Sequence, residues 1–314
     1  MSSSRLHGVL VTYRRLAQLE NTLKVLDDQR RSLDTLAVVD NDPGGSARRV
    51  VPDRPGIEYI HAGENIGPAG GIALGMRHVL GYADDDDWVV LLDDDDPPRR
   101  ADTLAVLADF GDDLRRGDPT VAAVGKSGTN FNIRLARSIR TPDHMLDGPV
   151  PSDCIGGNQV PFISVHAIRT VGVFDERLFF GFEELEYGLR LRAAGFRVYV
   201  HGGLWREDRA YHNRLGLRTD PDRRLAHLSW RRYYSIRNLI YILRKRGHPI
   251  SASKVTARSL LKPLYNIPHH PALAGQHLRV AMRAIADAYL QRMGRTVEPE
   301  AKYDHQDELG QAPR

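Results

Sequence analysis

Four consecutive aspartates, Asp93–Asp96, directly follow the apolar run Trp88–Leu92 and are stopped by two prolines. Four carboxylates so close together repel one another, and the repulsion raises some of their pKa values unless a cation lies between them. Carboxylate oxygens suit Mg²⁺ and Mn²⁺, which are usually held by one or two carboxylates together with substrate phosphates. The cluster therefore predicts a divalent-metal site. We interpret the upstream run Asp84–Asp87 as a solvated acidic turn.

A second acidic group, Glu183-Glu184-Leu185-Glu186, comes directly after the aromatic segment Leu178–Phe182. Carboxylates in the first turn of a helix interact favourably with the helix dipole, which is one interpretation. The other is a general base, because a glutamate beside an aromatic wall is partly desolvated and its pKa rises toward the operating pH. The residues alone leave both interpretations open.

The glycine-rich segment Gly63–Gly71 lets the backbone approach a ligand closely and places amide donors at the start of a helix, where phosphate binds well. Its spacing matches neither the dinucleotide-binding pattern nor the P-loop. The absence of G-x-S-x-G argues against an α/β-hydrolase.

Short apolar runs alternate with amphipathic ones over the first part of the chain, which predicts β-α-β units and an α/β fold with a mostly parallel sheet. Ligands bind beyond the carboxyl ends of such strands, where the Asp40 turn and the Asp93 cluster fall. The predicted strands are 6–13, 36–39, 57–60, 88–92 and 121–124, and the predicted helices are 16–29, 72–80, 100–114 and 183–194.

The composition is that of a soluble globular protein, with 314 residues, 44 Lys and Arg against 40 Asp and Glu, and 41% hydrophobic residues. A single cysteine, Cys154, excludes a disulfide framework and a multi-thiolate zinc site. We see no apolar signal segment and no run long enough to span a bilayer, so we expect a cytoplasmic protein.

Charge is divided unevenly, since residues 1–200 carry 23 basic and 30 acidic residues whereas residues 201–314 carry 21 and 10. Beyond Trp230 the pattern is helical and mixes aromatic with basic residues. Such a surface suits an anionic membrane, with which it would make a peripheral contact on the inner face. A plain amphipathic helical subdomain is the alternative, and nucleic acid is not expected because no recognised binding motif accompanies the charge. We therefore expect a catalytic domain over 1–212 and a helical, basic segment over 213–314 that binds acceptor, membrane or a second copy in a homo-oligomer.

In their order along the chain, these segments resemble the inverting family 2 glycosyltransferases of the GT-A fold, and most closely the galactofuranosyl- and rhamnosyltransferases. The resemblance covers about three quarters of the chain. Its landmarks are Val9-Leu-Val-Thr-Tyr13, Val38-Val-Asp-Asn41, Glu64-Asn-Ile-Gly-Pro-Ala-Gly-Gly71, Leu92-Asp-Asp-Asp95, Val171-Gly-Val-Phe-Asp-Glu176, Glu183-Glu-Leu-Glu-Tyr-Gly-Leu-Arg190 and Arg232-Tyr-Tyr-Ser-Ile-Arg-Asn238.

The resemblance implies roles for the donor side of the site. Asp93 and Asp95, with Asp94 beside them, would hold Mn²⁺ or Mg²⁺ on the donor diphosphate, and Asp40 would accept a hydrogen bond from a pyrimidine base. Four further residues would lie at the nucleotide-sugar: Thr12, Tyr13, Asn65 and Gly67.

The resemblance also implies the base and a further metal ligand. Glu184 matches the catalytic base, with Glu183 as the alternative because both side chains are one methylene longer than the more usual aspartate. A downstream histidine would join the metal, and His212 is preferred over His201.

The function that follows is metal-dependent, inverting transfer of a sugar from a nucleotide-diphosphate donor to an acceptor hydroxyl. The resemblance favours UDP-galactofuranose, then dTDP-rhamnose or another nucleotide-sugar. The sequence does not identify the acceptor, and a polysaccharide, a lipid-linked saccharide and a natural-product scaffold all remain open. A nucleotidyltransferase with the same carboxylate–metal site and a non-catalytic nucleotide- or polyanion-binding protein are the alternatives.

Overall fold

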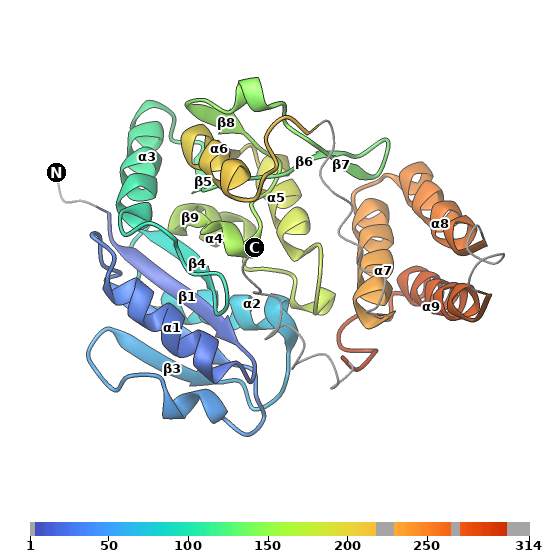
Figure 1. The fold of residues 1–314 in the computed structure, drawn as a ribbon, viewed down its shortest axis with the longest axis horizontal. Helices are drawn as coiled ribbons and strands as arrows, with labels where there is room; N and C mark the ends of the chain where they lie inside the picture. Colours follow the sequence, from blue (N-terminus) through green and yellow to red (C-terminus); the bar gives the residue numbers. More distant parts are fainter. Residues whose placement is uncertain (1–3, 218–228, 265–270, 300–314) are drawn as a thin grey trace. The chain divides into compact units, whose positions relative to one another are not determined.

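The computed structural model describes residues 4–217, 229–264 and 271–299, which fall into two compact units (Figure 1). The N-terminal unit contains residues 4–132, 137–176 and 183–217. The C-terminal unit contains residues 229–264 and 271–299 together with two short earlier segments, 133–136 and 177–182.

The N-terminal unit is built on an eight-stranded sheet of order β3-β2-β1-β4-β9-β5-β10-β8. Neighbouring strands β3, β2, β1 and β4 are parallel, as are β5 and β10, whereas β9 and β8 run antiparallel to their neighbours. The predicted α/β class with a mostly parallel sheet is confirmed. The strands are β1 (Leu6–Thr12), β2 (Thr35–Asp40), β3 (Ile57–His61), β4 (Trp88–Asp93), β5 (Val121–Gly125), β8 (Pro149–Pro151), β9 (Phe162–Ser164) and β10 (Arg197–His201), and β6 (Asn130–Asn132) pairs separately with β7 (Arg137–Ile139).

Apolar side chains alternate along the strands and form one core on each face of this sheet. One core contains residues of α1 and α3, the other contains residues of α2, α4 and α5, and α6 contributes to both. The helices are α1 (Leu16–Asp27), α2 (Gly67–Val79), α3 (Thr103–Gly117), α4 (Val165–Val171), α5 (Glu183–Ala193) and α6 (Gly202–Tyr211), and the short 3₁₀ turns are η1 (Ser46–Arg49), η2 (Asp143–Met145), η3 (Gly157–Gln159) and η4 (Glu176–Leu178).

Helix α2 begins five residues before the predicted start, inside the glycine-rich segment. Pro68 in its first turn needs no amide partner there and has the helical φ already fixed. Gly71 is needed for a different reason. A Cβ atom at this position would lie 2.5 Å from Cγ1 of Val11 on β1, so no larger residue fits there. Part of the glycine content therefore serves the close packing of α2 on the sheet.

The C-terminal unit consists of three helices, α7 (Ser229–Lys245), α8 (Pro249–Leu264) and α9 (Pro271–Tyr289), which pack against one another. Two basic side chains of α8 fasten the segment 133–136, since Lys254 Nζ donates to the carbonyl of Arg134 (3.2 Å) and Arg258 to that of Ala136 (3.0 Å). The predicted helical character of this part is confirmed. Among the described helices, none combines the length and the apolar composition that a membrane span requires.

Candidate active site

Three parallel strands end side by side and bring the predicted donor residues to one edge of the sheet. Thr12, the last residue of β1, lies opposite Asp40 at the end of β2, and Val11 lies opposite Asp93 at the end of β4. Tyr13 follows Thr12 and is half-buried. This edge is the position at which open α/β sheets bind ligands.

The aspartate cluster gathers three carboxylates in a small space. Asp93, Asp94 and Asp95 each place an oxygen within 4.8 Å of the others. Burial and the neighbouring Asp95 and Asp94 carboxylates raise the pKa of Asp93 to about 8. A divalent cation would relieve this repulsion, and an all-oxygen donor set fits Mg²⁺ or Mn²⁺.

Arg15 is a residue of this site that the sequence did not reveal. Its guanidinium donates to Asp94 Oδ1 (3.3 Å) and forms an ion pair with Asp95. Burial opposes its charge, but the Asp94 and Asp95 carboxylates outweigh this effect and raise the pKa of Arg15. Thr12 Oγ1 donates to the other oxygen of Asp94 at 2.7 Å. Arg15 is thus a counter-ion within the cluster. In the sequence it is visible only as one of two arginines that follow the first strand.

Asp40 is fully buried and holds the turn that follows β2. Its carboxylate accepts hydrogen bonds from the backbone amides of Asp42 and Ala47 (2.8 Å each) and from the Tyr59 hydroxyl (2.9 Å). Burial and the Asp40 carboxylate raise the pKa of Tyr59 to about 12, so its hydroxyl remains a donor. In this conformation the Asp40 carboxylate is not exposed to a ligand, and its contact with a base stays a prediction.

The segment before α2 is fastened to the β2 turn through side-chain amides. Asn65 Oδ1 accepts from the amide of Gly67 (3.0 Å), and Asn41 Nδ2 donates to the carbonyl of Gly67 (3.0 Å). Gly67 has φ of +72°, a conformation that glycine adopts without strain. The predicted residues Asn65 and Gly67 therefore form one ordered loop beside the strand ends.

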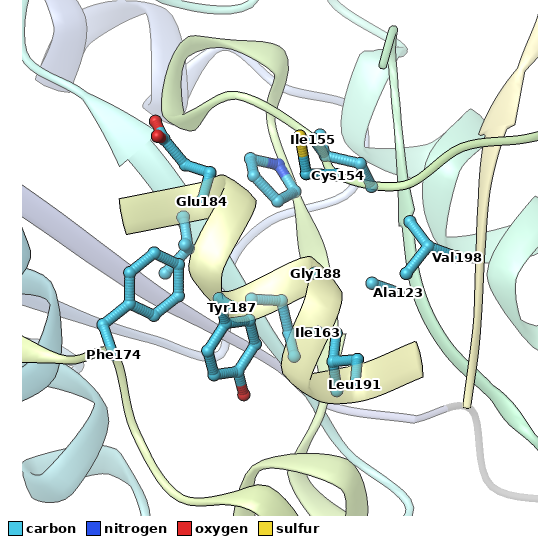
Figure 2. Close-up of a pocket in the computed structure, with 12 residues that line it drawn as sticks. Ala123, Cys154, Ile155, Ile163, Phe174, Glu184, Tyr187, Gly188, Leu191 and Val198 are labelled. Atoms are coloured by element: carbon cyan, nitrogen blue, oxygen red, sulfur yellow. The ribbon is translucent and has the colours of Figure 1, made fainter. Parts of the chain in front are cut away.

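Glu184 lies in the first turn of α5, above a small apolar pocket (Figure 2). The pocket has a free volume of about 20 Å³, room for little more than one water molecule. Its lining includes Leu91, Pro161, Phe174, Tyr187 and Leu191. In Figure 2 the carboxylate points away from Tyr187 and Leu191.

The two glutamates at the start of α5 differ in their surroundings. Burial raises the pKa of Glu184, although the amide of Gly157 donates to Oε1 at 3.0 Å and acts in the opposite direction. Glu184 keeps part of its surface exposed, whereas Glu183 is only 5% exposed. A carboxylate with a raised pKa and an open side has the properties of a general base.

His212 follows the last residue of α6 and is not among the clustered ligands. In the described part of the chain, the group of metal-ligating atoms within 4.8 Å of one another consists of the three aspartates. His212 Nε2 lies 2.9 Å from Arg99 Nη2 and 3.9 Å from Asp208 Oδ1. Burial is the main cause that lowers its pKa.

His201 has a structural role at the start of α6. Its Nδ1 accepts the amide of Leu204 (3.2 Å), which caps the helix. Its ring also packs edge-on against Phe110, with centroids 5.0 Å apart.

The family model described as glycosyl transferase family 2 matches residues 9–175, more than half of the chain. The chain belongs to glycosyl transferase family 2. The matched part of this family 2 glycosyltransferase includes the aspartate cluster and ends before α5. Glu184 and nearly all of the C-terminal unit therefore lie outside the match.

Two curated relatives of this family 2 chain are galactofuranosyltransferases. GlfT1 of Mycobacterium tuberculosis is 43% identical over 81 residues, 25% of this chain and 27% of that protein. GlfT1 of Mycolicibacterium smegmatis is 40% identical over 79 residues, 25% of this chain and 26% of that protein. The match thus spans about a quarter of the length of these relatives.

Two solved structures show that this family 2 chain has the GT-A fold. The mannosyltransferase PcManGT from Pyrobaculum calidifontis, in complex with GDP-Man and Mn²⁺, is 17% identical with a TM-score of 0.50, over 93% of this chain and 88% of that one. GalNAc-T7 with UDP, GalNAc and Mn²⁺ is 10% identical with a TM-score of 0.54, over 92% of this chain and 57% of that one.

Proposed function

We propose that this glycosyltransferase moves a sugar, with inversion, from a nucleotide-diphosphate donor to an acceptor hydroxyl in a divalent-metal-dependent reaction. The observation that carries the proposal is the convergence of Asp93, Asp94 and Asp95 where β4 ends in a chain of this family. Both solved neighbours were captured with Mn²⁺, which supports a divalent ion, either Mn²⁺ or Mg²⁺. The partial likeness to GlfT1 favours UDP-galactofuranose as donor, then dTDP-rhamnose or another nucleotide-sugar.

The donor diphosphate would be bound at the strand ends. Asp93 and Asp95 would hold the metal, which supplies positive charge beside the leaving diphosphate. Thr12 and Tyr13, the Asp40 turn and the loop of Asn65 and Gly67 would surround the nucleotide. His212 would join the metal as a further ligand; in this structure its Nε2 contacts Arg99.

Glu184 would act as the base in a single displacement. The acceptor oxygen forms its bond to the anomeric carbon from the face opposite the diphosphate, while the bond from that carbon to the diphosphate oxygen breaks and its electron pair leaves with the diphosphate. The acceptor's hydroxyl proton passes to the Glu184 carboxylate. Glu184 is preferred over Glu183 because it keeps an exposed side from which an acceptor can be reached.

Calorimetry and product analysis test this function directly. We expect UDP to bind tightly only with Mn²⁺ present, and UDP-galactofuranose to release UDP when octyl galactofuranoside or octyl rhamnoside is supplied. Nuclear magnetic resonance of the glycoside product would then show the anomeric configuration opposite to that of the donor. Release of pyrophosphate from a nucleoside triphosphate supplied with a sugar 1-phosphate would instead identify a nucleotidyltransferase. Metal-independent UDP binding without turnover would identify a binding protein.

The C-terminal unit supports a lipid-linked acceptor and a peripheral contact with an anionic membrane. Its described residues include fifteen Lys and Arg and only two acidic residues. Ile250, Leu261 and Leu264 of α8 are exposed, at 74%, 56% and 43%. Exposed apolar residues among basic ones favour an anionic bilayer surface, at which each Lys or Arg contributes about 1 kcal/mol.

Vesicle co-sedimentation tests the membrane contact. The chain should sediment with phosphatidylglycerol-containing vesicles and not with pure phosphatidylcholine, and added salt should release it. Lys262→Ser on α8 should lower the affinity about five-fold, whereas Lys24→Ser on α1 should leave it unchanged. Equal binding to neutral vesicles, or equal effects of the two substitutions, would contradict the contact.

A further inference from the structure

The segment that leads into α5 has an unusual backbone. Phe179, Gly181 and Phe182 have φ values of +62°, +82° and +67°, so three residues within four are left-handed. Phenylalanine adopts this conformation at an energetic cost, and it persists only where the surrounding structure imposes it. Phe182 is bonded directly to Glu183, the first residue of α5.

One amide side chain holds this left-handed segment. Asn238 Nδ2, on α7, donates to the carbonyls of Leu178 (2.9 Å), Phe180 (2.9 Å) and Gly181 (2.8 Å). The side chain of Asn238 is fully buried. The Leu178 carbonyl also accepts from Arg237. The half-buried carbonyls of Phe180 and Gly181 would lose the Asn238 donor if the amide were removed, which is costly for acceptors shielded from water.

Arg237 fixes the direction in which that amide points. Its Nε donates to Asn238 Oδ1 (3.0 Å), so the amide nitrogen must face the carbonyls. Its Nη2 donates to the Leu178 carbonyl (2.9 Å), and its Nη1 donates to the Gly294 carbonyl (2.7 Å). Arg237 therefore joins the segment 177–182 to the residues that follow α9.

The body of α5 is anchored separately, by its own packing in the N-terminal unit. Tyr187, one turn after the helix start, stacks on Phe174 with ring centroids 4.4 Å apart. Leu191, one turn later, is 1% exposed. In the first turn Leu185 is also buried, whereas Glu184 is partly exposed and follows the left-handed segment after a single residue.

We propose that Asn238, oriented by Arg237, is a positioning residue for the catalytic base: it fixes the left-handed segment 178–182 and thereby the first turn of α5 that carries Glu184. This inference rests on the proposed role of Glu184. It gives a function to the last two residues of Arg232-Tyr-Tyr-Ser-Ile-Arg-Asn238, which the sequence singles out without a role. Arg237 and Asn238 act through the backbone of this segment and do not touch substrate.

Two variants and a matched control test the inference in the full-length protein. Asn238→Leu keeps the approximate shape and removes the donors, and Gly181→Ala strains the segment without removing any buried polar group, since Gly181 has φ of +82°. Tyr233→Phe is the control, because it removes hydrogen bonds from the same helix to Asp287 (2.6 Å) and Thr296 (2.8 Å) and leaves the side-chain donors to the segment in place.

The measurements are kcat and KM for UDP-galactofuranose with octyl galactofuranoside, Mn²⁺-dependent UDP affinity, and Tm. Asn238→Leu and Gly181→Ala should each lower kcat about 10- to 100-fold, the effect of displacing a catalytic group by about 1 Å. The KM for the donor and the affinity for UDP should stay within about two-fold. Tyr233→Phe should leave kcat within about two-fold at a similar loss of Tm.

A double-mutant cycle separates positioning from general destabilisation. In the Glu184→Gln background, Asn238→Leu should lower the residual kcat by less than about three-fold, because the base whose position it sets is already absent. Fully additive effects, an unchanged kcat in Asn238→Leu, or an equal loss of kcat in Tyr233→Phe would each overturn the inference.

The cycle also distinguishes this inference from the proposed function. If Glu184→Gln retains full transfer, the assignment of the base fails, and the inference fails with it. If Glu184→Gln abolishes transfer while Asn238→Leu does not affect it, only the positioning role is wrong.

Discussion

The carboxylates that follow β4 and those that begin α5 differ in what surrounds them. Asp93 is partly buried beside two other carboxylates and a guanidinium, and its pKa is raised by burial and by its acidic neighbours together. Glu184 lies above an apolar pocket, and burial alone raises its pKa while backbone amides oppose the shift. The first arrangement is relieved by a cation, whereas the second favours a proton acceptor.

Removing a carboxylate from the cluster after β4 should have the largest effect on activity. Asp95→Ala removes a proposed metal ligand, so Mn²⁺-dependent UDP binding and turnover should both be lost, with kcat falling about 1000-fold or more because a metal supplies several kcal/mol of transition-state stabilisation. Calorimetry and UDP release measure the two losses. Asp86→Ala, in the other acidic run, should change neither, and retention of metal-dependent UDP binding in Asp95→Ala would exclude this metal site.

Replacing Glu184 at the start of α5 should slow the transfer step without weakening donor binding. Glu184→Gln keeps the shape and the acceptor oxygen for the Gly157 amide but cannot take a proton, so kcat should fall about 100-fold or more. Donor KM and UDP affinity should remain as in the unaltered protein. Glu183→Gln is the matched variant, and a larger loss of kcat there would move the base by one residue.

The strand ends of this site could be predicted from the sequence, because each is marked locally. Apolar runs that stop at Asp40 and Asp93 indicate buried strands and the edge at which ligands bind, and the structure ends β2 and β4 at those residues. The start of α5 is also marked by a local sequence signal, since three glutamates follow an aromatic run. The sequence does not indicate β9, a three-residue strand inserted between β4 and β5 whose pairing is entirely long-range.

Residues that act through distant contacts could not be predicted. Arg15 meets Asp94 and Asp95 across about 80 positions of sequence, and Asn238 meets the segment 178–181 across about 60. No local periodicity encodes such pairs, because they depend on which strands and helices become neighbours. The position of His212 relative to the aspartates has the same origin, and its role as a metal ligand stays a prediction.

Removing the Arg15 guanidinium should increase the affinity of the aspartate cluster for Mn²⁺. Arg15→Met should strengthen binding of Mn²⁺ alone by roughly three- to ten-fold at mildly alkaline pH, because the ion no longer competes with a guanidinium for Asp94 and Asp95. Arg14→Met is the control, since Arg14 contacts Asp42 instead (2.8 Å). Calorimetric titration of Mn²⁺ without nucleotide measures both, and weaker Mn²⁺ binding in Arg15→Met would show that Arg15 supports the ion.

The smallest expected effect is on thermal stability. It distinguishes the aspartate cluster from Glu184, because Mn²⁺ should change the Tm effect of a substitution only in the cluster. A carboxyl whose pKa is raised on folding binds its proton more tightly in the folded state, so the free energy of unfolding falls as pH rises above the ordinary value, 3.8 for Asp93 and 4.5 for Glu184. For Asp93 this loss continues to about pH 8. Asp93→Asn and Glu184→Gln remove these losses, so each should raise Tm by a few degrees at neutral pH and leave it nearly unchanged at pH values below those ordinary values.

Adding Mn²⁺ should then separate the two variants. The ion stabilises the ionised Asp93 in the unaltered protein, so the advantage of Asp93→Asn should disappear or reverse when thermal unfolding is followed with saturating Mn²⁺. The advantage of Glu184→Gln should persist, because burial and not charge repulsion causes its pKa shift. An advantage of Glu184→Gln that also disappeared with Mn²⁺ would mean that the two carboxylate groups share one ion, and their assignment to separate metal and base roles would fail.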